Sequence, residues 1–269
     1  MTKTIRVPAS SANLGPGFDV LGMAIDRYLE VEFAEEGIGS PDHLTMRVFR
    51  QFGGTGGLKI SSTIPPARGM GFSGAARVAG LLAAATQNGT ELNDECRRWL
   101  FLEATKLEGH PDNVAPSVFG GVTVAVGDRV LPVPLGLQAN VVLWIPETLS
   151  GTKESRGKLP KEVSMEDAVF NMGRTALLLA ALTNGDTDLL ADASEDRLHQ
   201  EIRLAALPDT AEAMEAARAG GAWCSWLSGS GPTAAALCEP AMAQQVADAL
   251  PEGGEVSISH VDMRGAVYE

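Results

Sequence analysis

Four stretches of the sequence concentrate the residue types that carry chemistry. Three are rich in Gly and Ser and span residues 8–19, 66–76 and 228–233, and the fourth spans residues 108–116. Glycine lets the backbone approach a ligand closely. The fourth stretch, Glu-Gly-His-Pro-Asp-Asn-Val-Ala-Pro, places a histidine, an aspartate and an asparagine within four residues, and such side chains transfer protons or orient a hydroxyl. It also has a purely structural interpretation, as a turn held by its Asp and Asn side chains.

The stretch 66–76, Pro-Ala-Arg-Gly-Met-Gly-Phe-Ser-Gly-Ala-Ala, leads directly into an Ala- and Leu-rich segment that predicts a helix from Ser73 to about Gln87. Gly69 and Gly71 allow a ligand to reach the free N–H groups of the first helical turn. The dipole of a helix N-terminus favours an anion there by roughly 0.3–1 kcal/mol, without any lysine. The sequence therefore predicts a phosphate-binding loop, with a plain strand-to-helix turn as the alternative.

Several other kinds of site are excluded. The nearest approach to a P-loop, residues 151–159, has one residue too many and Leu159 where a Ser or Thr must contact Mg²⁺. The three cysteines, Cys96, Cys224 and Cys238, lie too far apart for a CxxC metal site, and the four histidines form no HExxH motif.

The composition is that of an acidic globular protein. The 269 residues include 21 Lys and Arg against 34 Asp and Glu, a formal net charge of −13. Nucleic-acid binding depends on Lys and Arg replacing phosphate counterions, so a nucleic acid is not expected as a main partner. The longest apolar runs, 78–85 and 176–182, are too short to span a bilayer, and the first residues form no signal-peptide core. We expect a cytoplasmic protein that contacts no membrane.

A mixture of strands and helices must position the polar stretches. Strands followed by helices are expected in both halves, which indicates an α+β fold with domains at 1–137 and 138–269. In the first half, the patterns predict strands at 5–7, 28–33, 58–64, 118–126 and 130–133, and helices at 43–52, 73–87 and 91–107, the last capped by Asn93. In the second half, they predict strands at 141–145, 222–227 and 233–237, and helices at 165–183, 187–202 and 211–219.

Taken together, the polar stretches resemble one known family. Residues 7–22 (Val-Pro-Ala-Ser-Ser-Ala-Asn-Leu-Gly-Pro-Gly-Phe-Asp-Val-Leu-Gly), the stretch 108–116 and Ser-Gly-Ser-Gly-Pro-Thr at 228–233 are similar to motifs of homoserine kinases, in the GHMP kinase superfamily. The resemblance continues through Leu-Ser-Gly-Thr-Lys-Glu-Ser-Arg at 149–156 and Asp-Arg-Leu-His-Gln-Glu-Ile-Arg at 196–203. It implies the two-domain GHMP kinase fold, with an N-terminal ribosomal-protein-S5-domain-2-like domain that carries the phosphate-binding loop and a C-terminal ferredoxin-like α/β sandwich.

The same resemblance implies a kinase that uses ATP and Mg²⁺ to phosphorylate the side-chain hydroxyl of L-homoserine, in threonine biosynthesis, with a homodimer as one candidate assembly. The residues that it implies for binding the amino acid are Asn13, Asp19, His110, Asn113, Thr152, Arg203 and Gly229. Catalytic roles near the hydroxyl and the transferred phosphate fall to Asp112, Arg156 and Ser73. Whether Asp112 takes the proton or only orients the hydroxyl stays open, because phosphoryl transfer asks mainly for positioning and charge neutralisation.

The physical chemistry of an amino acid agrees with these assignments. A zwitterion needs an acid for its ammonium group, a role that suits Asp19. Its carboxylate needs a fork of donors, and the bidentate geometry of Arg203 suits that group better than a lysine does.

On the nucleotide side, the resemblance implies a phosphate cradle and a metal site. The residues of the cradle are Pro66, Arg68, Gly69, Met70, Gly71, Phe72, Ser73 and Gly74, with His43 near the adenine. Ser73 is the expected hydroxyl ligand of Mg²⁺, and a carboxylate ligand is expected from the helix before His110. Leu102 falls at the expected spacing, so the neighbouring Glu103 is our choice.

Two features depart from the family pattern, and both lie on the nucleotide side. The family's loop usually has the sequence Gly-Leu-Gly-Ser-Ser-Ala, whereas here Phe72 replaces a hydroxyl residue and Gly74 loosens the first helical turn by about 1 kcal/mol relative to Ala. His43 stands where the family usually has Asn.

Three alternatives to a homoserine kinase therefore stay open. One is a GHMP-fold kinase that acts on a different alcohol. Another is a GHMP-fold protein that binds its ligands but transfers phosphate poorly because of Phe72. The weakest is a hydrolase with a nucleophile elbow at Ser73, because Ala75 stands where such an elbow needs Gly.

Overall fold

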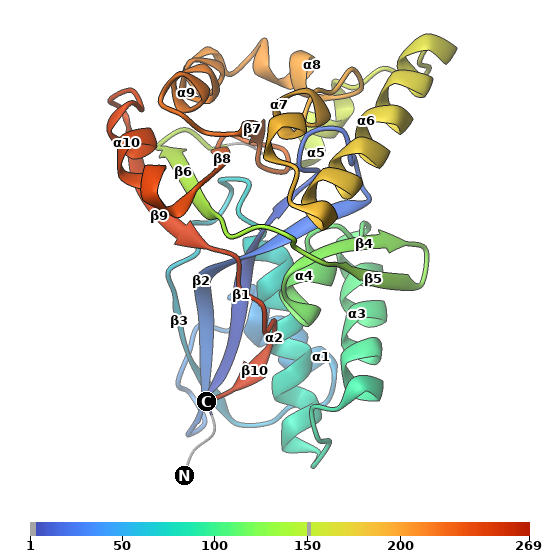
Figure 1. Ribbon diagram of the computed structural model, residues 1–269. Coiled ribbons are helices and arrows are strands. Elements are labelled where there is room, and N and C mark those ends of the chain that lie inside the picture. The colour runs from blue at the N-terminus through green and yellow to red at the C-terminus, as the bar shows by residue number, and fades with distance from the viewer. Residues whose placement is uncertain (1–3, 150–151) are drawn as a thin grey trace.

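The computed structural model describes residues 4–149 and 152–269, without the side chains of residues 152–154. The described residues form two antiparallel β-sheets with their helices, which make up the lower and upper parts of the molecule in Figure 1. Within these ranges, no helix is both long and apolar enough to cross a membrane.

The first sheet has the strand order β10-β1-β2-β4-β5, and β3 pairs with the far half of the long β2. The bounds are β1 (Ile5–Ala12), β2 (Leu21–Ala34), β3 (Gly57–Ser62), β4 (Val122–Val126), β5 (Arg129–Val133) and β10 (Val267–Tyr268). The first two strands extend well beyond their predicted ranges and are joined by a loop that rises into the upper part of the molecule (Figure 1). The first Gly/Ser-rich stretch is therefore half strand and half loop.

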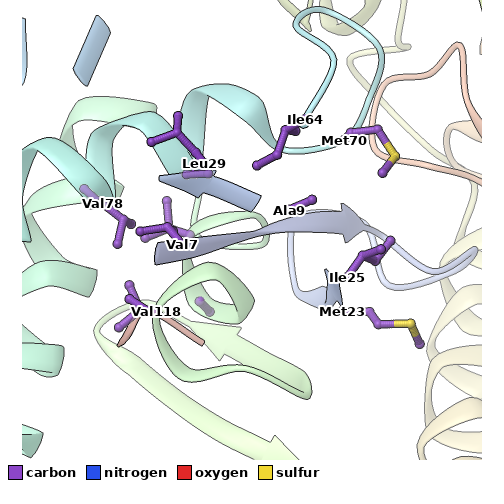
Figure 2. Packing of buried hydrophobic residues seen from close by; sticks show 14 of the residues in the cluster. Val7, Ala9, Met23, Ile25, Leu29, Ile64, Met70, Val78 and Val118 are labelled. Atoms are coloured by element: carbon purple, nitrogen blue, oxygen red, sulfur yellow. The ribbon is translucent and has the colours of Figure 1, made fainter. Parts of the chain in front are cut away.

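The helices of the first half build its core. They are α1 (Leu44–Gln51), α2 (Phe72–Gln87), α3 (Asp94–Glu108), which Asn93 caps as predicted, and α4 (Val114–Phe119). Helix α2 is buried on nearly every side, which explains its sequence of small and aliphatic residues. Figure 2 shows Val7 and Leu29 of the sheet meeting Val78 of α2 and Val118 of α4. A Cβ on Gly80 would lie 2.5 Å from the Thr45 carbonyl oxygen, so the glycine allows α1 to approach.

The second sheet has the order β7-β8-β6-β9, with every pair antiparallel. Its strands are β6 (Asn140–Pro146), β7 (Cys224–Leu227), β8 (Ala234–Cys238) and β9 (Gly254–His260). The first strand of the four lies between the third and the fourth, which is the arrangement of a ferredoxin-like sandwich. Helices α9 (Pro208–Ala219) and α10 (Ala243–Asp248) pack on one face, while Val141, Leu143 and Trp226 of the other face join the core of the first half.

The prediction of one continuous helix at 187–202 is wrong. Helix α6 (Met165–Asn184) is followed by three short pieces, η1 (Thr187–Leu189), α7 (Leu190–Ala193) and α8 (Gln200–Leu204). The chain leaves the helix where the Asp196 carboxylate accepts hydrogen bonds from the N–H groups of His199 and Gln200. A carboxylate that competes in this way for backbone N–H groups ends one helix and starts the next.

Several elements were missed by the sequence patterns. They are α4, α5 (Thr152–Gly157), η2 (Pro240–Met242), α10, β9 and β10. The predicted strand at 118–126 is also too long, because Val118 belongs to α4 and the strand begins only at Val122. Strand β10 pairs with β1 in the first sheet, so the end of the chain returns to the first half. The domain limits 1–137 and 138–269 stay a prediction.

Candidate active site

The loop between β1 and β2 presents the first group of polar residues. Asn13, Leu14 and Asp19 have positive φ angles of 71°, 49° and 59°, a left-handed backbone that costs about 1 kcal/mol or more in residues other than Gly. Asn13 holds this loop, because its Nδ2 donates to the Gly229 carbonyl at 3.0 Å and its Oδ1 accepts from the Asp19 N–H at 3.1 Å. The strained backbone at Asp19 is thus fixed by the asparagine predicted to contact the amino acid.

Two hydroxyl groups, from the residues directly after β7 and directly before β8, hold the turn before α2 through hydrogen bonds. Ser228 Oγ donates to the Gly69 carbonyl and Thr233 Oγ donates to the Arg68 carbonyl, both at 2.6 Å. Gly69 has a φ of 74°, and a Cβ there would lie 2.3 Å from the Ser228 carbonyl oxygen. Gly71, the residue before the helix, has no side chain that could cap it, so the N–H groups of the first turn remain donors for a ligand.

A cavity of about 240 Å³ opens in front of this turn. Its lining comes from the turn, the end of α3, the start of α4 and the loop between β7 and β8, namely Ala67, Arg68, Gly69, Met70, Gly71, Phe72, Ser73, Glu108, Asn113, Gly229 and Ser230. Most residues predicted for the phosphate cradle therefore surround one cavity, together with two of the residues predicted for the amino acid. The side chain of Met70 itself belongs to the core (Figure 2).

Glu108, the last residue of α3, connects the cavity to α2. Its Oε1 accepts a hydrogen bond from Ser73 Oγ, and its Oε2 forms an ion pair with Arg77. The Glu108 side chain is only 10% exposed, so its charge is compensated mainly by these two partners. A hydroxyl and a carboxylate thus meet at the start of the helix, an oxygen pair of the kind that Mg²⁺ prefers.

Next to it, His110 lies between two carboxylates. Its Nδ1 is 2.5 Å from Asp112 Oδ1, and its Nε2 is 3.9 Å from Glu108 Oε1. Burial opposes protonation of the ring, but the hydrogen bond and charge of Asp112, with the charge of Glu108, raise the pKa of His110 above its ordinary value. The Asp112 side chain is nearly inaccessible and also accepts the N–H of Asn113.

Two arginines converge on the loop after β1. Arg156 of α5 forms a bidentate pair with Asp19, with Nη1 2.7 Å and Nη2 2.6 Å from its two oxygens, and this pair raises the pKa of Arg156. Arg203 of α8 is buried, and no carboxylate of the described residues lies within ion-pair distance of it. The ring of Phe18 lies beside both, 5.3 Å from each guanidinium carbon. An acid and two guanidinium groups therefore meet beside the phosphate-loop cavity.

Comparisons with known proteins agree with this geometry. The GHMP kinases N terminal domain matches residues 43–121, and GHMP kinases C terminal matches residues 178–256. A homoserine kinase of Thermus thermophilus is 42% identical over 274 residues, which cover 93% of each chain. The homoserine kinase of Moorella thermoacetica is 41% identical and covers 87% of this chain and 86% of its own. The chain belongs to the homoserine kinase family of GHMP kinases.

Solved structures show the same fold. The homoserine kinase from Cytophaga hutchinsonii matches with a TM-score of 0.83 and 26% identity, over 100% of this chain and 97% of that chain. The mevalonate kinase of Methanococcus jannaschii, at 14% identity, matches with a TM-score of 0.72 over 97% and 98% of the two chains, which shows a common fold alone. The GHMP kinase fold expected from the motifs is confirmed.

Some residues predicted from the homoserine kinase motifs lie apart from the cavity. Glu103, five residues before Glu108 in the same helix, forms an ion pair with Lys106 at 2.6 Å and does not line the cavity. Pro66 and Gly74 flank the lining residues, and the side chain of Thr152 lies outside the described residues. Glu108 was missed at the level of sequence, although its position directly before Gly109 and His110 was visible in the motif.

The two departures from the homoserine kinase pattern contact each other. The rings of His43 and Phe72 meet edge to face, with centroids 5.9 Å apart. His43 also caps α1, where its Nδ1 accepts the Thr45 N–H at 3.2 Å, and burial lowers its pKa. Phe72 thus lines the cavity and also contacts the ring that caps α1.

Proposed function

We propose that the protein transfers the γ-phosphoryl group of ATP to the side-chain hydroxyl of L-homoserine, giving O-phospho-L-homoserine for threonine biosynthesis. The observation that carries this proposal is the meeting of two carboxylates and a buried guanidinium beside the phosphate-loop cavity. An acid, Asp19, and a buried guanidinium, Arg203, match the two ends of an amino acid. Asp112 and the phosphate-loop cavity lie beside them.

The amino-acid side follows from charge and shape. Asp19 would receive the ammonium group of the substrate, and Arg203 would receive its carboxylate, as a bidentate fork. Asp19 is paired with Arg156 in this structure, so the ammonium group takes over one partner of an existing ion pair. Arg156 is then released toward the negative charge of the transferred phosphoryl group.

In this proposal, the N-terminus of α2 binds the phosphates of ATP, and oxygen ligands bind the magnesium ion. The N–H groups at the start of α2 and the guanidinium of Arg68 would hold the phosphates of ATP. The oxygens of Ser73 and Glu108 are ligands of the kind that Mg²⁺ takes, and we propose that these two residues hold it. When bound, Mg²⁺ supplies charge neutralisation on the phosphates.

We propose that Asp112 acts on the substrate hydroxyl. It is buried, and His110 and the Asn113 N–H fix its Oδ1. Such a carboxylate orients the hydroxyl and accepts its proton as the bond to phosphorus forms. Correct orientation of two bound reactants can supply roughly 7–11 kcal/mol of the barrier reduction, so positioning is the larger part of the catalysis.

The proposal includes a cellular setting. Three cysteines that are free and buried fit a reducing compartment, and we propose the cytoplasm. The net charge of −13 makes small molecules, rather than nucleic acids, the expected partners. A homodimer stays a prediction, which light scattering on the purified protein would test.

The decisive experiment is a coupled ADP-release assay with MgATP and L-homoserine, with L-serine, L-threonine and mevalonate as control alcohols. We expect turnover with homoserine at the highest kcat/KM. Turnover that favours another alcohol would support a different GHMP kinase. Binding of homoserine by calorimetry without turnover would support a ligand-binding homologue, in which Phe72 impairs the phosphate loop.

A further inference from the structure

A buried histidine, His199, lies behind the proposed amino-acid site and has no part in the phosphoryl transfer proposed above. It stands directly before α8, one helical turn ahead of Arg203, and is 1% exposed. Its Nδ1 lies 3.0 Å from Arg203 Nη1, and its Nε2 lies 2.8 Å from the Gly15 carbonyl oxygen. One imidazole ring therefore connects the guanidinium to the loop that carries Asp19.

These two contacts determine the protonation of the ring. A guanidinium only donates hydrogen bonds, so Nδ1 of His199 must accept. A carbonyl only accepts, so Nε2 must carry the proton. Burial and the charge of Arg203 lower the pKa of His199, although Asp196, 3.8 Å away, opposes the shift. The neutral Nε2–H tautomer is the form that satisfies both neighbours.

Arg203 depends on this contact for its orientation. Its Nη1 makes one other hydrogen bond, to the Gly229 carbonyl at 3.1 Å, and its buried Nε has no partner among the described residues. A guanidinium recognises a carboxylate through two parallel hydrogen bonds, so the plane of the group must be set before the substrate arrives. Among the described residues, His199 is the one side chain that forms a hydrogen bond with this guanidinium.

The other side of the ring acts on the loop after β1. The Gly15 carbonyl accepts from Nε2, and the ring of Phe18 packs on the imidazole with centroids 5.1 Å apart. Gly15 has a φ of 88°, and a Cβ there would lie 2.3 Å from the Ser194 carbonyl oxygen, so the loop lies directly against this part of the fold. Asp19 follows four residues after Gly15 in the same loop.

We infer that His199 is a positioning residue that holds Arg203 and the Asp19 loop at a set spacing, so that the carboxylate and the ammonium group of the substrate are recognised together. The inference rests on the proposed function. It assigns to His199 the selectivity for an amino acid over an amino alcohol that lacks the carboxylate.

The test compares His199→Leu, His199→Gln and the unmodified protein on two substrates, L-homoserine and 3-amino-1-propanol, which keeps the amine and the hydroxyl but has no carboxylate. For His199→Leu, we expect KM for homoserine to rise at least about tenfold, with KM for ATP changed less than about twofold. The preference for homoserine over the amino alcohol should fall by a similar factor. His199→Gln, which offers both a donor and an acceptor, should recover part of the preference.

Thr175→Val serves as the matched control. Thr175 Oγ donates to the Pro16 carbonyl at 3.0 Å, so it tethers the same loop without touching Arg203. We expect this variant to keep the preference for homoserine. Equal losses on both substrates in His199→Leu, or the same loss of preference in Thr175→Val, would overturn the inference.

A second measurement uses ¹⁵N-histidine spectra, in which the signals of His199 are assigned by their absence in His199→Gln, because His43 also accepts a hydrogen bond at Nδ1. The His199 ring should remain the neutral Nε2–H tautomer from about pH 8 to about pH 6. If that ring becomes protonated within this range, the inference fails. A protein that neither binds nor turns over homoserine refutes the proposed function, whereas an active protein whose selectivity His199→Leu leaves unchanged refutes this inference alone.

Discussion

At the scale of single residues, the site is built from short motifs that have to be held at strained backbone positions. Asp19 illustrates this, because its carboxylate is useful only while Asn13 fixes a left-handed loop. The stretches around Asp19, Asp112 and Ser73 stood out by their residue types, and the resemblance to homoserine kinases supplied the predicted roles. The partner of Ser73 was not predicted, because sequence spacing pointed to Glu103, whereas the carboxylate that reaches the hydroxyl belongs to Glu108, five residues later.

Glu108 and Glu103 offer a matched pair of tests for the proposed magnesium site. Removing the charge in Glu108→Gln should raise the Mg²⁺ concentration needed for half-maximal activity by about 10–100-fold, because a carboxylate ligand is lost. Glu103→Gln breaks only the ion pair with Lys106, whose side chain is exposed, and should leave the Mg²⁺ dependence unchanged. Magnesium titrations of initial rates, with thermal melting to verify folding, measure both. If the two variants needed the same Mg²⁺ concentration for half-maximal activity, Glu108 would not be the proposed magnesium ligand.

At the scale of secondary-structure elements, the helices with the strongest sequence patterns were predicted best. The Ala-rich α2 and the Asn93-capped α3 follow from composition and capping. The segment 187–202 has an equally helical pattern, but a tertiary feature, the Asp196 carboxylate, interrupts it. Strand β10 is only two residues long, and its pairing with β1 is decided by contacts remote in sequence. Local patterns contain no information about such pairings.

Two glycines of α2 should respond oppositely to alanine. A Cβ on Gly74 would meet Asn113 Cβ at 3.5 Å, an ordinary contact, so Gly74→Ala should stabilise the fold by about 0.5 kcal/mol. A Cβ on Gly80 would lie 2.5 Å from the Thr45 carbonyl oxygen, so Gly80→Ala should destabilise it by about 1–3 kcal/mol. Urea unfolding measures both changes. A loss of stability in Gly74→Ala would show that the loop geometry, rather than helix propensity, requires the glycine.

At the scale of the whole molecule, the two sheets share one core, and charged pairs add contacts between them. Arg27 of β2 pairs with Glu255 of β9, and Asp26 of the same strand lies 2.9 Å from His260. Composition could not show this arrangement. The proposed amino-acid site lies where the loop after β1 meets helices of the second half, so it exists only in the assembled fold.

Stability should depend on pH through the buried histidine. The fold lowers the pKa of His199, so below about pH 6.5 this histidine is protonated in the unfolded chain while it is still neutral in the folded chain. Stability from this group is therefore present above that pH and lost as the pH falls, with a limiting slope of about 1.4 kcal/mol per pH unit. Relative to His199→Gln, the unmodified protein should lose stability between about pH 7.5 and about pH 5.5 in urea titrations. A difference that does not vary with pH would contradict the burial of a neutral ring.

The pairing of β10 with β1 has a consequence for folding during translation. Residues 267–268 emerge from the ribosome after the other strands of this sheet, yet they pair with Ile5 and Arg6 of the strand that emerges first. Until then, this end of β1 presents unpaired N–H and C=O groups on one side, and such an edge is open to pairing with another chain. This part of the sheet therefore closes only after the other strands have been synthesised, because its pairing depends on contacts remote in sequence.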